Sequence, residues 1–224
     1  MGNKIILLAI VLLAAVSGAV AQTAPYTREK EWEKEINAFL EIDAKQTPPE
    51  KAVLFTGSSS IRLWKTLRTD FPHLKVINRG FGGSRFEDLN FLAPKVVLPY
   101  KPSKIVVYTG ENDIQDGQPA EDVLADFKEL VVFRDKNLPG VPIVYISLKP
   151  SILRWKLWPE MSRANALIRE ESKKHNKVTF ADLASKMLGT DGKPLPDIFV
   201  SDGLHMNEKG YAIWRENLGP FLKS

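Results

Sequence analysis

The stretch "AVLFTGSSSIRLW", residues 52–64, places an apolar run directly before a glycine, three serines and the start of a helical pattern. Four similar apolar runs follow along the chain: "KVINRG", "KIVVYTG", "PIVYISL" and "VTFADL", which begin near residues 75, 104, 142 and 178. Short continuous apolar runs are typical of strands that are buried on both faces of a sheet. The sequence therefore predicts about five buried strands.

Helical patterns alternate with these strands. Residues 119–137 and 159–176 are long enough for crossover helices. Residues 28–46 form an amphipathic helical pattern whose apolar side chains lie mostly three and four apart: Trp32, Ile36, Phe39, Leu40 and Ile42. Strands that alternate with helices predict a parallel sheet covered on both faces, in one α/β domain.

The length and composition set the organisation of the chain. It has 224 residues, of which 44% are apolar and 26% charged, as expected for a globular protein with one core. No internal repeat or long linker divides the sequence. We expect a signal peptide at residues 1–21, a helical extension packed on the domain at residues 22–50, and the α/β domain at residues 51–224.

The first 21 residues, "MGNKIILLAIVLLAAVSGAVA", have the features of a secretory signal. One lysine precedes an apolar stretch, and Ala19 and Ala21 stand in A-x-A spacing before Gln22. An uncleaved membrane anchor is the alternative, but the apolar core is shorter than the roughly 20 residues that a spanning helix needs. We therefore expect a secreted or periplasmic protein, cleaved after Ala21, with no stable membrane anchor.

The chain contains no cysteine, so disulfides, thiolate metal sites and cysteine catalysis are excluded. The net charge of +4 is spread along the chain rather than gathered in one block. Nucleic acid binding therefore has little electrostatic support.

Polar loops follow the first three predicted strands: "GSSS" (57–60), "RGFGGS" (79–84) and "TGEND" (109–113). Ligand sites of parallel sheets lie beyond the carboxyl ends of the strands. By itself "GSSS" is an ordinary turn and helix cap. The glycine-rich loop lacks the third glycine of a dinucleotide fingerprint, because Arg85 stands there. Gly82 and Gly83 instead let a backbone N–H approach a ligand oxygen, and Asn112 offers a neutral donor.

The stretch "VSDGLHMNEKGYAIW", residues 200–214, contains the most informative pair. Asp202 and His205 are three apart, so the carboxylate can accept the Nδ1–H of the imidazole while Nε2 faces a nucleophile. Of the other two histidines, His175 lies in the cationic run "KKHNK" and His73 in the polar segment "FPHLK". We expect an active role for His205 alone.

These four stretches resemble the four sequence blocks of the SGNH/GDSL hydrolase family, including its members related to platelet-activating-factor acetylhydrolases. They occur in the family's order between residues 53 and 214. The resemblance implies a three-layer flavodoxin-like fold and ester hydrolysis through a serine. It places the nucleophile on Ser59, with Trp64 at the usual spacing, and the acid and base on Asp202 and His205. It places the oxyanion hole on the backbone N–H groups of Ser59 and Gly83 and the side-chain amide of Asn112.

One position departs from the family pattern, because Ser58 stands where an aspartate usually precedes the nucleophile. That aspartate is a supporting residue rather than a member of the triad, so the resemblance still implies the same reaction type. The larger α/β-hydrolase class is not favoured, because Ile61 stands where the second glycine of its G-x-S-x-G elbow should be.

The resemblance implies a reaction that needs no metal or cofactor. Our leading hypothesis is an esterase for short acyl or acetyl groups, including those on carbohydrate. The alternatives are a lysophospholipase or thioesterase of the same fold and a binding module that has lost turnover. Trp155 and Trp158, near Lys149 and Arg154, either line the substrate site or belong to the core. The sequence predicts no oligomeric state.

Overall fold

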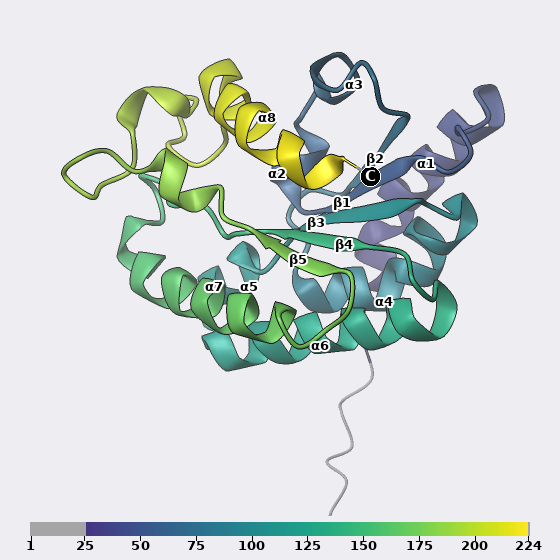
Figure 1. Ribbon diagram of the computed structural model, residues 1–224, viewed down its shortest axis with the longest axis horizontal. Coiled ribbons are helices and arrows are strands. Elements are labelled where there is room, and N and C mark those ends of the chain that lie inside the picture. The colour runs from purple at the N-terminus through teal and green to yellow at the C-terminus, as the bar shows by residue number, and fades with distance from the viewer. Residues whose placement is uncertain (1–25, 224) are drawn as a thin grey trace, which may run out of the picture.

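A computed structural model describes residues 26–223, and its centre is a parallel sheet with helices on both faces (Figure 1). The strand order is β2-β1-β3-β4-β5. The strands are β1 (Val53–Gly57), β2 (Val76–Gly80), β3 (Lys104–Tyr108), β4 (Ile143–Ile146) and β5 (Val178–Ala181). Every neighbouring pair is parallel. The predicted α/β fold with five parallel strands is confirmed, and each strand begins within one residue of its predicted start.

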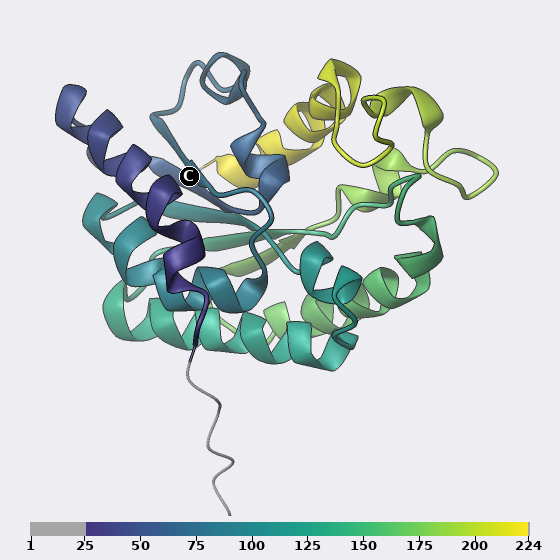
Figure 2. The ribbon, with the colours of Figure 1, turned by 180° about the vertical axis from the view of Figure 1, so that it is seen from behind.

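The helices fill two layers. The α-helices are α1 (Glu33–Lys45), α2 (Ser59–Arg62), α3 (Leu67–Asp70), α4 (Phe86–Val96), α5 (Glu111–Gln115), α6 (Ala120–Asn137), α7 (Trp158–Ser172) and α8 (Glu208–Leu222). The 3-10 helices are η1 (Glu29–Trp32), η2 (Leu98–Tyr100), η3 (Trp155–Leu157), η4 (Ala184–Met187) and η5 (Pro196–Ile198). Helices α2, α3 and α8 lie on one face of the sheet, and α4, α6 and α7 lie on the other (Figures 1 and 2). This is the predicted three-layer arrangement.

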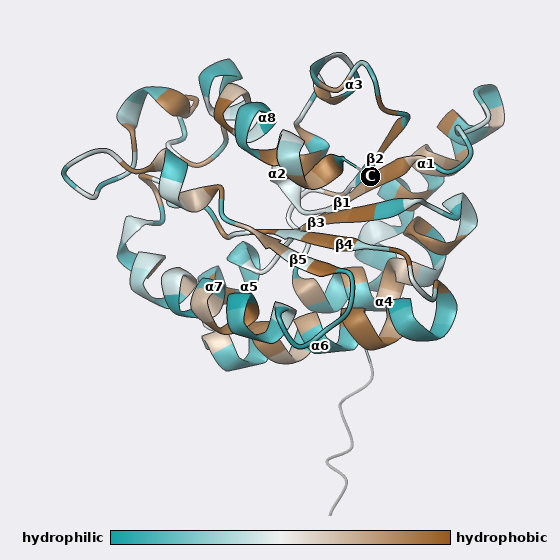
Figure 3. Ribbon diagram, viewed as in Figure 1, coloured by the Kyte–Doolittle hydropathy of each residue, from teal (hydrophilic) through white to brown (hydrophobic). Residues whose placement is uncertain are grey.

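The strands are apolar along their whole length because both faces are covered. All residues of β1 and β4 are buried. In Figure 3 the strands are largely hydrophobic, whereas the surrounding helices carry both hydrophobic and hydrophilic residues. Burial of both sheet faces removes the alternation of apolar and polar residues that a half-exposed sheet would show.

The N-terminal extension packs with only part of its predicted apolar face. Trp32 is buried, but Leu40 and Ile42 are 58% and 53% exposed, so their predicted packing was wrong. The two residues flank the contact face of α1, and a charged residue occupies its middle. Asp43 accepts a hydrogen bond from the guanidinium of Arg79 on β2. An ion pair therefore replaces part of the apolar contact expected from the helical spacing.

The predicted signal peptide, residues 1–21, lies outside the described residues. Between residues 26 and 223, no helix combines the length and the apolar composition needed to cross a membrane.

Candidate active site

The serine loop lies where the strand order reverses, between the carboxyl ends of β1 and β3. Gly57 ends β1 with φ of +115°, and a Cβ there would lie 2.0 Å from the carbonyl oxygen of Tyr108 on β3. Only glycine fits this close approach. The next residue, Ser58, donates its backbone N–H to the same carbonyl oxygen at 2.9 Å. The loop is thus held against β3, at the place where ligands bind in open parallel sheets.

The three serines differ in their exposure. Ser58 and Ser60 are buried, with 3% and 2% of their surface exposed, whereas Ser59 is half-buried. Ser59 is the first residue of α2. Its backbone N–H donates to no acceptor within residues 26–223. Of the three, Ser59 is therefore the serine that a ligand can reach.

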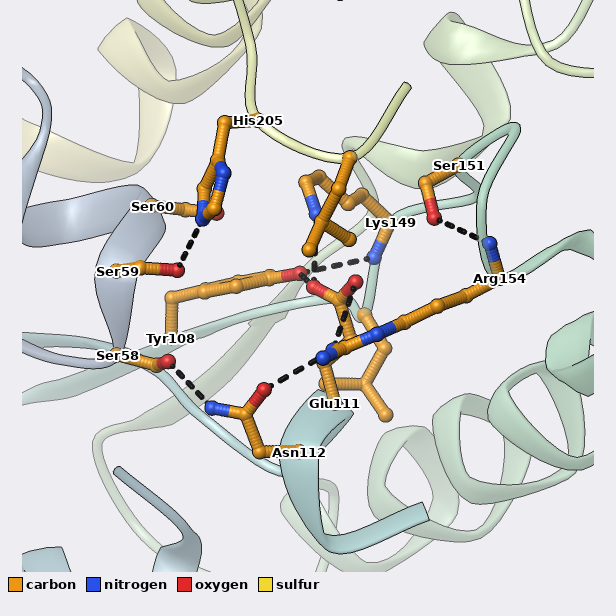
Figure 4. Close-up of polar contacts among 12 residues, drawn as sticks. Ser58, Ser59, Ser60, Tyr108, Glu111, Asn112, Lys149, Ser151, Arg154 and His205 are labelled. Atoms are coloured by element: carbon orange, nitrogen blue, oxygen red, sulfur yellow. Dashed lines mark hydrogen bonds and ion pairs between the residues drawn. The ribbon is translucent and has the colours of Figure 1, made fainter. Parts of the chain in front are cut away.

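Ser59, His205 and Asp202 form a continuous chain of hydrogen bonds. The Oγ of Ser59 lies 3.0 Å from Nε2 of His205 (Figure 4). Nδ1 of His205 lies 2.6 Å from Oδ2 of Asp202. Oδ1 of Asp202 accepts the backbone N–H groups of Leu204 and His205, at 2.8 and 2.9 Å. This is the arrangement in which a histidine can take a proton from a serine while a carboxylate holds its ring.

The Asp202 carboxylate is stabilised in its charged form. Partial burial acts to raise its pKa, but the hydrogen bonds from the ring of His205 and from the backbone of Leu204 and His205 outweigh this effect and lower the pKa to about 2. Asp202 is therefore ionised across the neutral range, as a partner of an imidazolium must be.

The start of α8 fixes the position of the histidine loop. The side chain of Asn207 caps the helix by accepting the N–H groups of Lys209 and Gly210. One turn further, the hydroxyl of Tyr211 donates to the carbonyl oxygen of Ser60 at 2.9 Å. This bond joins α8 to α2, so the elements that hold His205 and Ser59 are fixed to each other.

Gly83 lies in the loop after β2, as predicted for a backbone donor. Its φ is +86°, a conformation that favours glycine, and the residue is exposed. Within residues 26–223 its N–H, like that of Ser59, has no hydrogen-bond acceptor. Two backbone donors of the predicted oxyanion hole are thus free to bind a ligand oxygen.

Asn112, on α5, has hydrogen bonds at both ends of its amide. Its Nδ2 donates to Oγ of Ser58 at 2.9 Å and to the carbonyl oxygen of Ser84 at 2.8 Å. Its Oδ1 accepts from Nη1 of Arg154 at 3.0 Å (Figure 4). Ser58, which stands at the family's aspartate position, thus links the nucleophile loop to Asn112.

Behind Asn112 lies a buried cluster of charges that the sequence did not predict. Glu111 receives hydrogen bonds from the hydroxyl of Tyr108 and, at 2.8 Å, from Nζ of Lys149. Nη1 of Arg154 lies 3.3 Å from the other carboxylate oxygen. Burial acts to raise the pKa of Glu111, but Lys149 and Arg154 lower it overall. The sequence analysis had named Lys149 and Arg154 beside the two tryptophans, but no sequence pattern linked them to Glu111.

The other residues singled out in the sequence lie outside this constellation. His73 is exposed, and Nε2 of His175 lies 3.0 Å from Oε1 of Glu171. Trp155 and Trp158 are half-buried and stack on each other, with ring centroids 6.1 Å apart. No group of three or more potential His, Asp or Glu metal ligands occurs between residues 26 and 223.

The fold defines the class of the protein, because the five-stranded parallel sheet with helices on both faces is the SGNH hydrolase fold. Residues 54–213 match the GDSL-like Lipase/Acylhydrolase family, so the chain belongs to that family. The resemblance seen in the sequence is confirmed. No curated protein matches the chain.

Several solved structures share the fold. One is a candidate platelet activating factor from Streptococcus pneumonia, with a TM-score of 0.77 and 19% identity over 87% of this chain and 94% of that one. A GDSL-like lipase from Bacteroides thetaiotaomicron has a TM-score of 0.70 and 20% identity over 83% and 96% of the two chains. An acetylxylan esterase from Geobacillus stearothermophilus has a TM-score of 0.61 and 14% identity over 75% and 93%.

Proposed function

We propose that this protein is a serine esterase that hydrolyses short acyl or acetyl esters, including acetyl groups on carbohydrate. The observation that carries the proposal is the hydrogen-bonded chain from Ser59 through His205 to Asp202, which begins at the accessible serine of the loop. The acetylxylan esterase among the proteins with this fold supports the choice of acetyl esters.

In the proposed reaction, His205 Nε2 takes the hydroxyl proton of Ser59 as Oγ bonds to the ester carbonyl carbon. The carbonyl π electrons move to oxygen. The N–H groups of Ser59 and Gly83 donate to this oxyanion because they have no other acceptor between residues 26 and 223. When the intermediate collapses, the C–O bond to the alcohol breaks and the alcohol leaves with the proton from His205. Water then repeats the sequence on the acyl-enzyme, which releases the acid and restores Ser59.

Asn112 supplies the third donor in this proposal. Its Nδ2 is bonded to a hydroxyl oxygen and a carbonyl oxygen, both neutral acceptors. A bond to a neutral acceptor is weaker than one to an anion, so the developing oxyanion is the better acceptor and competes for an N–H of the amide. Each such donor is typically worth roughly 3 kcal/mol of activation barrier.

The second candidate is hydrolysis of lysophospholipids or thioesters with longer acyl chains. Ile152, Leu153 and Val200 are 49%, 62% and 44% exposed. They adjoin the triad loop, since the N–H of Leu153 donates to the carbonyl oxygen of Gly203 at 3.0 Å. Exposed apolar side chains beside a catalytic loop favour contact with an acyl chain.

The test is a panel of p-nitrophenyl esters of increasing chain length, acetylated sugars and a lysophospholipid. If the main proposal is right, kcat/KM should be highest for acetyl esters, and hydrolysis should be lost in Ser59→Ala. If the second candidate is right, kcat/KM should be highest for esters with longer acyl chains. A fluorophosphonate probe checks the nucleophile: it should label Ser59, and labelling of Ser58 or Ser60 would contradict the assignment. A binding module without turnover would show neither hydrolysis nor labelling.

We further propose that the protein is exported and cleaved after Ala21, from the pattern of residues 1–21 alone. N-terminal sequencing of the exported protein should begin at Gln22. An intact N-terminus on membrane-bound protein would support the anchor instead.

A further inference from the structure

Arg154 contacts the predicted oxyanion residue from a distant part of the chain. It lies in the loop between β4 and α7, and its Nη1 donates to Oδ1 of Asn112 at 3.0 Å across 42 residues of sequence. We propose that Arg154 is a positioning residue that fixes which end of the Asn112 amide faces the catalytic centre. The proposal rests on the oxyanion role of Asn112 given above.

The orientation of this amide matters because its two ends are nearly equal in shape and opposite in polarity. Nδ2 directed at the oxyanion donates a hydrogen bond, whereas Oδ1 in its place would repel the negative charge. A guanidinium has donors only. With Arg154 on one side, the amide must present Oδ1 to the arginine and Nδ2 to Ser58 and Ser84, as observed.

Ser58 cannot set the orientation of the amide alone. A serine hydroxyl both donates and accepts, so it would bond to either end of Asn112. The usual aspartate of the family would, as an anion, accept only and would therefore select Nδ2. Because Ser58 occupies that position, the orientation of the amide is set by the carbonyl of Ser84 and by Arg154. Of these two groups, only Arg154 is charged.

Arg154 is itself held by a buried carboxylate. Its Nη1 lies 3.3 Å from Oε1 of Glu111, the residue directly before Asn112. The Glu111 side chain is only 5% exposed and Arg154 is 12% exposed. Lys149 and Tyr108 occupy the other carboxylate oxygen, so Oε1 is left to the arginine (Figure 4). The guanidinium is thus fixed next to the amide that it orients.

The charge of Arg154 has a second effect on Asn112. A cation at Oδ1 draws electron density toward that oxygen and polarises the amide, which makes the N–H groups of Nδ2 stronger donors. Arg154 therefore acts on the reaction through Asn112, and its contribution should vanish when Asn112 is removed.

A double-mutant cycle tests this dependence. Arg154→Ala should lower kcat by about 10- to 100-fold, the range expected for a lost hydrogen bond to a charged group, with KM within about twofold of wild type. Arg154→Ala combined with Asn112→Ala should lose no more than Asn112→Ala alone. Arg154→Lys keeps the charge beside Glu111 and can still donate to Oδ1, so it should recover part of the rate. Arg169→Ala, which removes an arginine of α7 that pairs with Asp182 after β5, is the control and should have wild-type kcat.

Two outcomes of the cycle would overturn the proposal. Multiplicative losses in the double variant would mean that Arg154 acts independently of Asn112. A rise in KM alone would make Arg154 a residue for ground-state binding of the substrate.

A measurement that needs no activity separates this proposal from the esterase assignment and covers a failure of Arg154→Ala to fold. The side-chain amide resonances of Asn112 in a ¹⁵N–¹H spectrum are identified by their absence in Asn112→Ala. They should shift in Arg154→Ala and, in the same direction but by a smaller amount, in Arg154→Lys, and stay in place in Arg169→Ala. If wild type shows no hydrolysis but these shifts occur, the esterase proposal fails, while the orientation of the Asn112 amide by Arg154 stands. Unchanged resonances in a folded Arg154 variant would overturn the positioning role.

Discussion

Asp202 and His205 lie three residues apart in one solvent-exposed loop, whereas Asn112 depends on a buried cluster drawn from α5 and from the loop after β4. We call the first region, Ser59, Asp202 and His205, the triad side, and the second, Asn112, Glu111, Lys149 and Arg154, the amide side. The Asp202 side chain is 42% exposed, while those of Glu111 and Lys149 are 5% and 1% exposed. Exposed charges contribute little to stability, but breaking a buried ion pair is costly. Changes on the triad side should therefore affect rate, and changes on the amide side should also affect folding.

The largest effect is expected on the triad side, from Asp202→Asn. An amide favours the wrong imidazole tautomer, so kcat/KM should fall by about 10³- to 10⁴-fold while the free energy of unfolding stays near wild type. Asp197→Asn, at an exposed carboxylate paired with Lys209, is the control. A large loss of stability in Asp202→Asn would show that the triad side, like the amide side, contributes to folding, and would contradict the comparison.

The pH profile of the wild type sharpens this prediction. Because the pKa of Asp202 is about 2, its carboxylate does not titrate near neutrality. Activity should rise through the neutral range, where histidines titrate, and level off in mild alkali. The rise should persist in His73→Ala and His175→Ala and in buffer with a chelator. A neutral pH limb that survives in His205→Ala would assign the base to another group.

On the amide side, Glu111→Gln should lower the free energy of unfolding by about 3 to 5 kcal/mol, because Lys149 and Arg154 would be left buried without their counter-charge. Urea unfolding measures the change. Glu170→Gln, which breaks an exposed pair with Lys173, should leave stability unchanged. Equal effects of the two substitutions would remove the proposed difference between buried and exposed charges.

A buried carboxylate next to the amide side should make stability depend on pH. Burial raises the pKa of Asp113 to about 6, even though its Oδ1 accepts the N–H of Phe86. In the unfolded chain the group titrates near about 3.9. The folded state thus holds the proton more tightly, and stability is lost as the pH rises from about 4 through 6.

Asp113→Asn should abolish this contribution. Between about pH 4 and pH 7, the free energy of unfolding of the variant relative to wild type should rise by roughly 2 to 3 kcal/mol. Asp116→Asn, at an exposed carboxylate just after α5, should leave the slope unchanged. Parallel curves for wild type and Asp113→Asn would show that another group causes the pH dependence.

The smallest effect is expected where the two sides meet, at Ser58. Ser58→Ala removes one neutral acceptor of the Asn112 amide and should lower kcat by about two- to fivefold, as expected for one neutral hydrogen bond. Ser60→Ala, at the other buried serine, should leave kcat unchanged. An equal loss in both variants would mean that packing of the loop, rather than the bond to Asn112, sets the rate.

Local patterns in the sequence determined the sheet and the triad side. The apolar runs located all five strands because burial on both faces requires continuous apolar residues. The pair Asp202 and His205 was visible because the two residues are close in sequence and bond within one loop. The polar ends of the strands indicated the site because parallel strands bring their carboxyl ends to one edge.

The amide side and the packing of α1 were decided only by the tertiary structure. Glu111 and Lys149 are 38 residues apart, and Asn112 and Arg154 are 42 apart, so no local pattern links them. A helical pattern also does not predict which side of α1 packs against the domain. In the structure, Leu40 and Ile42 are exposed, and Asp43 on the packed side pairs with Arg79. The physical reason is the same in both cases. The free energy of a buried charge depends on which opposite charge the folded chain brings next to it, and that partner comes from a distant segment.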